Sequence, residues 1–383
     1  MAAGHSVTGR SGDAGDCAFD VRIGGEAGQV RYKSSTPLTA SGETGLAVAL
    51  LPAMTQGGAL DIAPAVSPRL LAAAEHIQRI FLGWDRGDAF PHLGLKPVKV
   101  EAGPRTPPAE RAKGVGCFFS GGVDSFYTLL QHLDEVTDIV FVHGFDIPLD
   151  AASLRRRASD AAATVAEALG KNLVEIETDY RALAEPRLTW HHVFGAGLAA
   201  VAHLLSPRIG RMYIPGAHTW SNLVPDGSHP LLDPLWSSED LEIVFDGCEA
   251  TRTDKLALLA RSELALRHLR VCWQNPGGAY NCGRCEKCVR TKISMLAVGA
   301  LERCPVMPDG LDDRALARFD VRYARSLWVE LARDLKSMGA DARLQRIVQR
   351  VLDSRGPSRL AAAAQRGRNL LRRAFARSQD SER

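Results

Sequence analysis

A short stretch with two adjacent glycines, Gly116-Cys117-Phe118-Phe119-Ser120-Gly121-Gly122-Val123-Asp124-Ser125, constrains the fold of this chain more than any other feature. Its first half is apolar, and apolar residues at positions 126, 129, 130 and 133 follow with helical spacing. The stretch therefore predicts a buried strand, a tight loop and a helix start. The glycines remove Cβ atoms that would keep a ligand from the backbone, and the unpaired N–H groups of the first helical turn attract anions. We expect a phosphate-binding loop in which Asp124 can hold Mg²⁺.

The chain beyond this loop alternates strand and helix patterns. Helices are predicted over 158–169 and 192–205, and strands over 138–143, 173–177, 211–214 and 241–245. Repeated alternation of this kind predicts an α/β fold built on a doubly wound parallel sheet. Ligands of such sheets lie beyond the carboxyl ends of the strands, where the glycine loop would stand.

The sequence divides into segments of different character. In chain order we predict a disordered N-terminus over 1–16, a small α+β domain over 17–102, a proline-rich linker over 103–114, a domain that contains the glycine loop over 115–311, and a helical, Arg-rich C-terminal region over 312–383. Within the small domain, the runs 46–51 and 59–62 are strand candidates, and Ser67-Pro68 begins a helix. This domain carries no evident chemistry and could cap a substrate or form a homodimer contact.

Four of the eight cysteines lie close together, at Cys272, Cys282, Cys285 and Cys288. The spacing C-x₉-C-x₂-C-x₂-C lets a loop and the following helix start direct four thiolates at one tetrahedral ion. Such density is typical of a metal site and not of a disulfide framework. We expect a structural zinc knuckle over 272–288, although spacing alone also fits an iron–sulfur cluster.

The composition limits the possible partners and location. The net charge of +3 argues neither for nor against nucleic-acid binding. No apolar run reaches the length of a membrane span. Residues 1–16 lack the apolar core of a signal peptide, so we expect a cytoplasmic protein. Arginines become frequent after Arg343 and include Arg372, Arg373 and Arg377, but without interleaved aromatics. We expect a solvated helix surface there more than a nucleic-acid site.

The segment Ser-Gly-Gly-Val-Asp-Ser at 120–125 resembles the signature of the PP-loop ATP pyrophosphatases, also called the adenine nucleotide alpha-hydrolase superfamily. Together with the four-cysteine knuckle, it resembles the 7-cyano-7-deazaguanine synthase family. The resemblance covers roughly residues 113–301. It implies cleavage of ATP between the α and β phosphates in the presence of Mg²⁺, and a zinc ion with a structural role.

The resemblance also implies roles for individual residues. Lys255 resembles a family lysine near the phosphates, where a cation would stabilise developing charge, although it could equally be an exposed helix-start lysine. His191 beside Trp190 could offer a base or a stacking surface, or simply begin a helix. The expected catalytic residues are thus Asp124, Lys255 and His191. The expected nucleotide-binding residues are Ser120, Gly121, Gly122, Val123, Asp124, Ser125, His143 and Gly216.

These expectations describe an AMP-forming ligase. It adenylates an oxygen of a small-molecule substrate, releases pyrophosphate and lets a nitrogen nucleophile displace AMP. One alternative is a sulfur transferase acting on tRNA or a small molecule, for which Cys248 is the attractive catalytic cysteine. Of the remaining cysteines, Cys117 should be buried in the sheet, and Cys17 and Cys304 lie in other segments. A second alternative is a nucleotide-binding module without turnover.

Overall fold

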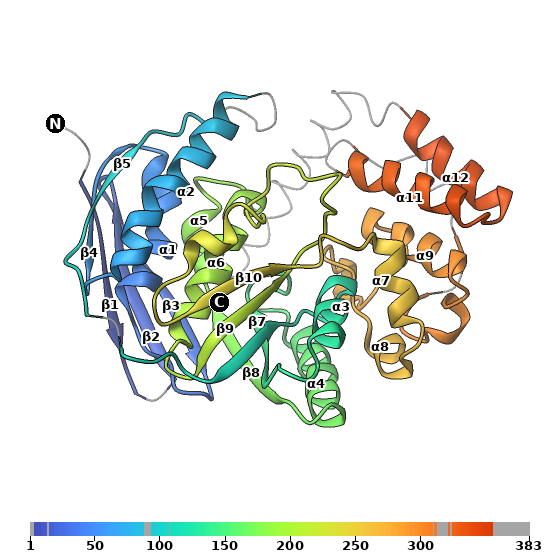
Figure 1. Ribbon diagram of the computed structural model, residues 1–383, viewed down its shortest axis with the longest axis horizontal. Coiled ribbons are helices and arrows are strands. Elements are labelled where there is room, and N and C mark those ends of the chain that lie inside the picture. The colour runs from blue at the N-terminus through green and yellow to red at the C-terminus, as the bar shows by residue number, and fades with distance from the viewer. Residues whose placement is uncertain are drawn as a thin grey trace, which may run out of the picture.

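The computed structural model describes residues 4–13, 15–87, 93–106, 108–308, 310–311, 321 and 324–354. Its centre is a ten-stranded, mostly parallel sheet with the strand order β10-β9-β6-β7-β8-β3-β2-β1-β4-β5. Helices cover both sides of this sheet (Figure 1). The predicted α/β class with a largely parallel sheet is therefore confirmed.

Half of the sheet consists of the strands that the sequence predicted after residue 113. They are all paired in parallel and comprise β6 (Gly114–Phe118), β7 (Asp138–His143), β8 (Asn172–Thr178), β9 (Ile209–Pro215) and β10 (Glu242–Asp246). Successive side chains of a strand point to opposite faces. Phe118 and Val140 accordingly join the core on one side, whereas Cys117 and Ile139 join the core on the other. Burial on both faces explains why these strands read as continuous apolar runs.

The helices that connect these strands lie on the two faces. They are α3 (Val123–Gln131), α4 (Ala152–Ala168), α5 (Tyr180–Ala184) and α6 (Trp190–Leu204), followed by the short η1 (Asp233–Trp236). Beyond β10 come α7 (Arg252–Leu259), α8 (Glu263–His268), η2 (Pro276–Gly278), α9 (Glu286–Ala297) and η3 (Leu301–Arg303). Figure 1 shows α6 on one face of the sheet, and α3, α4 and α7 to α9 on the opposite face.

The N-terminal strands extend the same sheet. They are β1 (Gly4–Ser11), β2 (Asp16–Ile23), β3 (Glu26–Ser34), β4 (Gly58–Ala63) and β5 (Val98–Glu101). The antiparallel pair β3–β8, with Tyr32 opposite Thr178, joins them to the parallel half. On the face of the sheet that α6 covers, one apolar core runs through both the N-terminal and the parallel half. Residues 17–102 thus share a sheet and a core with the region after them, where we expected a separate small domain.

The expectation of disorder at the N-terminus is wrong for residues 4–11. These residues form β1, which lies between β2 and β4 and pairs with both. Only alternate side chains such as His5 and Val7 are buried, so the segment looks polar although residues 6–11 pair with β2 and residues 4–8 pair with β4. A strand held mainly by its backbone carries a weak hydrophobic signal.

The strand predicted at 46–51 is also wrong, because this run lies inside helix α1 (Gly42–Met54). Every residue of α1 is buried, and the helix packs against α6 and the N-terminal strands. A short run that is apolar on all sides does not distinguish a buried helix from a buried strand. By contrast, the predicted strand at 59–62 lies in β4, and the predicted helix after Ser67 is α2 (Pro68–Arg86), with Ser67 as its N-cap.

Two C-terminal helices, α11 (Arg325–Ser337) and α12 (Ala342–Asp353), pack on each other, and α11 contacts α7 and α9 (Figure 1). Their shared core includes Trp328, Leu331 and Ile347, together with Val289 and Ile293 of α9. The helical character predicted for this region holds for these two helices. The predicted Arg372, Arg373 and Arg377 of the tail lie outside the described residues.

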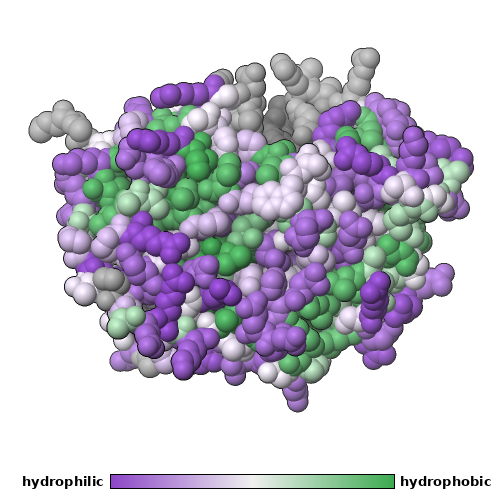
Figure 2. All heavy atoms as spheres, in the orientation of Figure 1, coloured by the Kyte–Doolittle hydropathy of each residue, from purple (hydrophilic) through white to green (hydrophobic). Residues whose placement is uncertain are grey.

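The surface offers few further constraints. Figure 2 shows hydrophilic residues spread over the whole visible face, with hydrophobic residues gathered in several separate areas. Within the part of the chain that the structure describes, none of the helices combines the length and apolarity needed to cross a membrane. In sheets of this kind, ligands bind beyond the carboxyl ends of the parallel strands.

Candidate phosphate and metal sites

The Ser120–Ser125 loop connects the carboxyl end of β6 with the start of α3. Gly121 has a φ of +73°, a left-handed conformation that favours glycine, and Gly122 is the N-cap of α3. The Gly122 N–H donates to Ser120 Oγ over 3.3 Å, and Ser125 Oγ donates to the Gly122 carbonyl over 3.0 Å. The predicted strand, loop and helix start are thus present, with β7 and β9 on either side of β6.

Asp124 lies in the first turn of α3 between two cations. Arg252 Nη2 is 2.8 Å from one carboxylate oxygen, and Lys255 Nζ is 3.3 Å from the other. Burial disfavours ionisation of this side chain, but Arg252, Lys255 and Lys287 outweigh burial and hold the Asp124 pKa well below its usual range. Asp124 is therefore a carboxylate that is ionised at neutral pH and lies at the start of a helix.

Lys255 is buried, so the alternative of an exposed helix-start lysine is wrong. It belongs to α7, whose N-terminus is fixed by a capping box between Thr251 and Asp254. Only 1% of the Lys255 surface is exposed, and Nζ also donates to the Gly216 carbonyl over 2.6 Å. Gly216 has no room for a side chain, since a Cβ would lie 2.3 Å from Phe245 Cζ. Three of the predicted residues, Asp124, Lys255 and Gly216, are thus neighbours.

Two buried arginines next to this group were missing from the sequence-based set. Arg252 and Arg290 are 5% and 3% exposed, and both have guanidinium nitrogens without a hydrogen-bond partner: Nε and Nη1 of Arg252, and Nη1 of Arg290. Arg290 Nε pairs with Glu286 Oε1 at 2.8 Å. Burial lowers the Arg252 pKa, against the opposing effect of Asp124. Charged donors are costly to leave unpaired, so the cluster is built to receive an anion.

His218 follows β9 in the loop beside this cluster. Its Nδ1 is buried without a partner among the described residues. Burial, and secondarily the charge of Arg290, lowers the pKa of His218 to about 4. A neutral imidazole therefore stands beside the cations. The expected nucleotide-binding residues included Gly216, two positions earlier, but not His218.

Two predicted residues lie apart from the Asp124 group. His143 ends β7 and is buried, and its Nε2 contacts Glu175 Oε1 at 3.0 Å and Ser159 Oγ at 3.3 Å. His191 lies in the first turn of α6 with 77% of its side chain exposed, and its Nδ1 is 4.0 Å from Asp226 Oδ1. Their contacts connect these histidines with β8, α4 and the 226–233 segment. Neither histidine has a hydrogen bond or ion pair with Asp124 among the described residues, but burial and then the charge of Lys287 lower the His191 pKa, so His191 lies near a lysine that also acts on Asp124.

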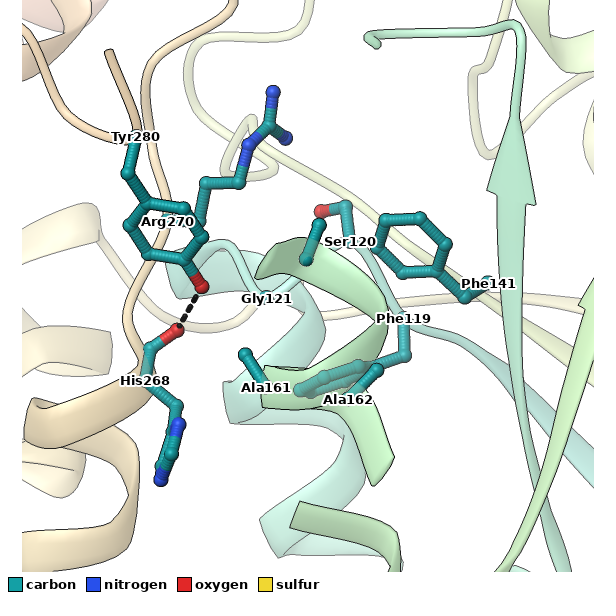
Figure 3. Close-up of a pocket in the computed structure, with 10 residues that line it drawn as sticks. Phe119, Ser120, Gly121, Phe141, Ala161, Ala162, His268, Arg270 and Tyr280 are labelled. Atoms are coloured by element: carbon teal, nitrogen blue, oxygen red, sulfur yellow. Dashed lines mark hydrogen bonds between the residues drawn. The ribbon is translucent and has the colours of Figure 1, made fainter. Parts of the chain in front are cut away.

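A small pocket opens beside the Ser120–Ser125 loop (Figure 3). Its walls include the rings of Phe119, Phe141 and Tyr280, together with Ser120, Gly121, Ala158, Ala161, Ala162, His268 and Arg270. The Arg270 backbone N–H donates to the Gly121 carbonyl over 2.7 Å, which joins the two sides of the pocket. Arg270 is 4% exposed, and its Nε has no partner. The pocket combines aromatic side chains with the Ser120–Ser125 loop.

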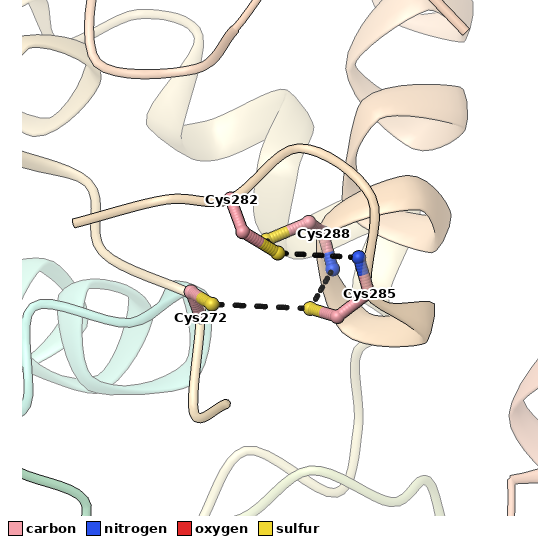
Figure 4. Close-up of side chains that lie close together, drawn as sticks. All are labelled: Cys272, Cys282, Cys285 and Cys288. Carbon is pink, nitrogen blue, oxygen red and sulfur yellow. Dashed lines mark hydrogen bonds between the residues drawn. The ribbon is translucent and has the colours of Figure 1, made fainter. Parts of the chain in front are cut away.

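The four predicted cysteines form a cluster whose Sγ atoms all lie within 4.8 Å of one another (Figure 4). The Cys272–Cys285 and Cys282–Cys288 sulfur pairs are 4.0 and 3.9 Å apart. Four sulfurs at about 2.3 Å from a tetrahedral zinc ion would be about 3.8 Å apart. The cluster can therefore hold a metal ion such as zinc.

The cysteine cluster is also coupled to the arginine group. Cys285 is the N-cap of α9, with its Sγ accepting from the Cys288 N–H, and α9 carries Glu286, Lys287 and Arg290.

Outside the cluster, Cys248 is buried, and burial raises its thiol pKa to about 11. Cys117 is buried in the sheet, as predicted.

Comparison of the chain with protein families, with curated proteins and with solved structures gave no significant match.

Proposed function

We propose that the protein is an ATP-dependent, AMP-forming enzyme of the PP-loop type. It adenylates an oxygen of a small-molecule substrate, releases pyrophosphate and lets a nitrogen nucleophile displace AMP. The observation that carries this proposal is the buried group of Asp124, Arg252 and Lys255 beside the Ser120–Ser125 loop, with unpaired guanidinium donors. A polyphosphate would supply the missing acceptors and balance the positive charge.

The residues of the site divide the work of phosphate binding. The backbone N–H groups at the start of α3 attract phosphate oxygens, and Arg252 and Lys255 neutralise charge that develops on the leaving pyrophosphate. As those cations turn to the phosphates, Asp124 loses its two partners and becomes available. A bound Mg²⁺, a hard cation with a preference for oxygen ligands, would be held by Asp124 and would neutralise phosphate charge.

We place the base of the nucleotide beside the pocket of Figure 3, whose cavity volume of about 10 Å³ must widen to admit it. The buried rings of Phe119 and Phe141 lie next to Ser120 and Gly121, and the Tyr280 ring is covered by Arg157 at 4.4 Å. Stacking on aromatic side chains is a general way to bind a nucleobase. The base and the phosphates would then occupy adjoining parts of one site.

The environment of Cys248 favours nitrogen over sulfur as the nucleophile. A thiol with a pKa of about 11 carries almost no thiolate near neutral pH, and the thiolate is the reactive form. In the proposed first step, the substrate oxygen bonds to the α-phosphorus while the bond to the bridging oxygen breaks, so pyrophosphate leaves. In the second step, the nitrogen lone pair attacks the activated atom, AMP leaves with the bonding electrons and the nitrogen loses a proton. That proton passes to solvent, because burial lowers the pKa of His218 to about 4 and makes its imidazole a weak proton acceptor.

We further propose that the cysteine cluster holds zinc in a structural role. Its four thiolates would complete a tetrahedral ion and leave no position open for chemistry. The ion would fix the start of α9 and thereby the place of Arg290.

The products of ATP decide the proposal. The protein is incubated with Mg·ATP labelled at the α or the γ phosphate and with fractionated metabolite extract as the source of substrate. We expect labelled AMP from the first nucleotide and labelled pyrophosphate from the second. The Lys255→Met variant should lose this activity, and Lys99→Met, an exposed lysine on β5, should keep it. Formation of ADP and inorganic phosphate would contradict the proposal.

A further inference from the structure

Helix α11 places one acidic side chain inside the molecule. Glu330 is 5% exposed, and α11 packs on α7 and α9, which carry the cations of the phosphate site. Glu330 has no salt bridge in the part of the chain that the structure describes; burial raises its pKa, and the charge of Arg252 opposes this only in part. A buried carboxylate without a paired cation lowers stability unless hydrogen bonds compensate it. Glu330 therefore calls for a role beyond packing.

Two side chains that donate to Glu330 lie in the loop after β9, and the Arg252 backbone N–H at the start of α7 also interacts with it. Oε2 accepts a hydrogen bond from Thr219 Oγ1 over 2.7 Å and another from Asn222 Nδ2. The side chain of Asn222 in turn holds the loop, because its Oδ1 accepts from the Thr219 N–H over 2.9 Å. Glu330 thus binds Thr219 and Asn222, the two residues whose hydrogen bond closes the loop.

The same loop carries residues of the phosphate site. Lys255 holds the Gly216 carbonyl at its start, and the Trp220 N–H donates to the Cys248 carbonyl over 3.0 Å. His218 lies between these two points and is close enough to Arg290 for their charges to interact. The loop is therefore fixed on one side by α7 and the end of β10, and on the other side by α11.

We propose that Glu330 is a positioning residue that holds the 216–222 loop, and with it His218, against the cations of the phosphate site. The C-terminal helices are then part of the nucleotide site and not an appendage. The consequence for ligand binding rests on the proposed function, whereas the ordering of the loop does not.

Hydrogen exchange of the ligand-free protein tests the ordering directly. We compare Glu330→Ala, Glu330→Gln and, as a control on the same helix, Arg333→Ala, whose side chain is exposed. The alanine variant should exchange the amides of 217–222 at least about tenfold faster, because two buried hydrogen bonds are lost. Glutamine keeps an accepting oxygen and should restore protection, and Arg333→Ala should match the unaltered protein. Equal protection in all variants would overturn the proposal, as would equal loss in the alanine and glutamine variants.

Titration calorimetry with Mg·ATP tests the consequence. We expect about tenfold weaker binding by Glu330→Ala and binding within about threefold of the unaltered protein by Glu330→Gln. Unchanged affinity in Glu330→Ala would overturn the link between α11 and the site. If the unaltered protein itself fails to bind Mg·ATP, the proposed function fails, while the exchange data still decide the role of Glu330. Should Glu330→Ala not fold, Thr219→Val removes one of the two donors without touching α11, and it should show the same local loss of protection.

Discussion

Two aspartates of this protein, Asp124 and Asp233, have pKa values shifted in opposite directions. Asp124 stands between Arg252 and Lys255, which hold its pKa well below the usual range. Asp233 is fully buried and is met by the Ser228 hydroxyl and the His229 N–H, and burial raises its pKa to about 7. Both groups suffer the cost of burial, but only Asp124 has cations to outweigh it.

The difference fits our proposal that Asp124 belongs to a ligand site, whereas the Asp233 carboxylate has its hydrogen bonds within its own turn. Two cations shared by one carboxylate leave an excess of positive charge beside the Ser120–Ser125 loop, and an anion can relieve it. Asp233 instead stands at the start of η1 and fixes the turn that begins at Ser228, where a protonated acid serves as well as an ionised one. Substitutions at the two positions should therefore act in opposite senses.

The largest effect should come from removing the metal that we propose for the cysteine cluster, since α9 carries Lys287 and Arg290 next to Asp124. Metal binding by four thiolates contributes roughly 10 kcal/mol in small zinc domains. Cys285→Ser should therefore lose metal and thermal stability together, and nucleotide binding with them. Elemental analysis and thermal unfolding measure this.

Cys248→Ser is the matched control and should keep one zinc per chain, because Cys248 lies outside the cluster. A brown protein that contains iron and sulfide would contradict the zinc assignment and favour the sulfur-transfer alternative.

The next effect concerns Asp124. Asp124→Asn leaves Arg252 and Lys255 without their carboxylate and should lower the free energy of unfolding by about 3–5 kcal/mol. Because the folded-state pKa is depressed, the contribution of Asp124 is fully present above pH 4 and is lost on acidification below it. Chemical denaturation at pH 7 measures the change. The double variant Asp124→Asn/Lys255→Met should recover part of the stability, and strict additivity of the two changes would speak against a shared ion pair.

A smaller effect of opposite sign is expected at Asp233. Its folded-state pKa is raised, so the unaltered protein loses stability as the pH rises from about 4 to about 7, and the cost of the buried charge is fully present above that range. Asp233→Asn removes the ionisable group and should be more stable than the unaltered protein by about 1 kcal/mol at pH 8, but not at pH 4. Denaturation curves at the two pH values give the result, and an Asn variant that is less stable at both would refute this account of Asp233.

The smallest effect should follow from Lys287→Met. Lys287 is half-buried and lowers the Asp124 pKa, though less than Arg252 and Lys255 do. A single partly solvated charge of this kind contributes about 0.5–1 kcal/mol, so the affinity for Mg·ATP should fall only about threefold. Calorimetry at two salt concentrations measures it, and the difference should shrink at the higher one. A loss as large as that of Lys255→Met would show that Lys287 contacts the ligand directly.

The sequence predicted those parts of the molecule in which local pattern and tertiary structure agree. The parallel strands, the Ser120–Ser125 loop and the cysteine cluster carry their chemistry in short segments, and all of them were found where we expected them. Helix α1 was mistaken for a strand because its burial on all sides removes the helical periodicity. The strand β1 was missed because its polar faces resemble disorder.

The charged residues of the candidate site could not have been predicted together from any single segment of the sequence. Asp124, Arg252, Arg290 and Glu330 are far apart in the sequence, and only the packing of α3, α7, α9 and α11 brings them together. Arg252 directly follows the N-cap of α7 and Arg290 comes two residues after the last cysteine, positions that gave no signal without the fold. His143 and His191 show the converse, since a strand end or helix start does not fix the direction of a side chain: their hydrogen bonds and ion pairs are with Glu175, Ser159 and Asp226.

The central claim is that the Ser120–Ser125 loop and its buried cations bind the phosphates of ATP. A crystal structure with Mg²⁺ and α,β-methylene-ATP, which resists cleavage between the α and β phosphates, tests it most directly. The account predicts phosphate density at the start of α3, the guanidinium of Arg252 turned from Asp124 to a phosphate oxygen, and the base beside Phe119 and Phe141. Phosphates bound elsewhere, or a site without nucleotide at saturating concentration in which Arg252 still pairs with Asp124, would contradict it.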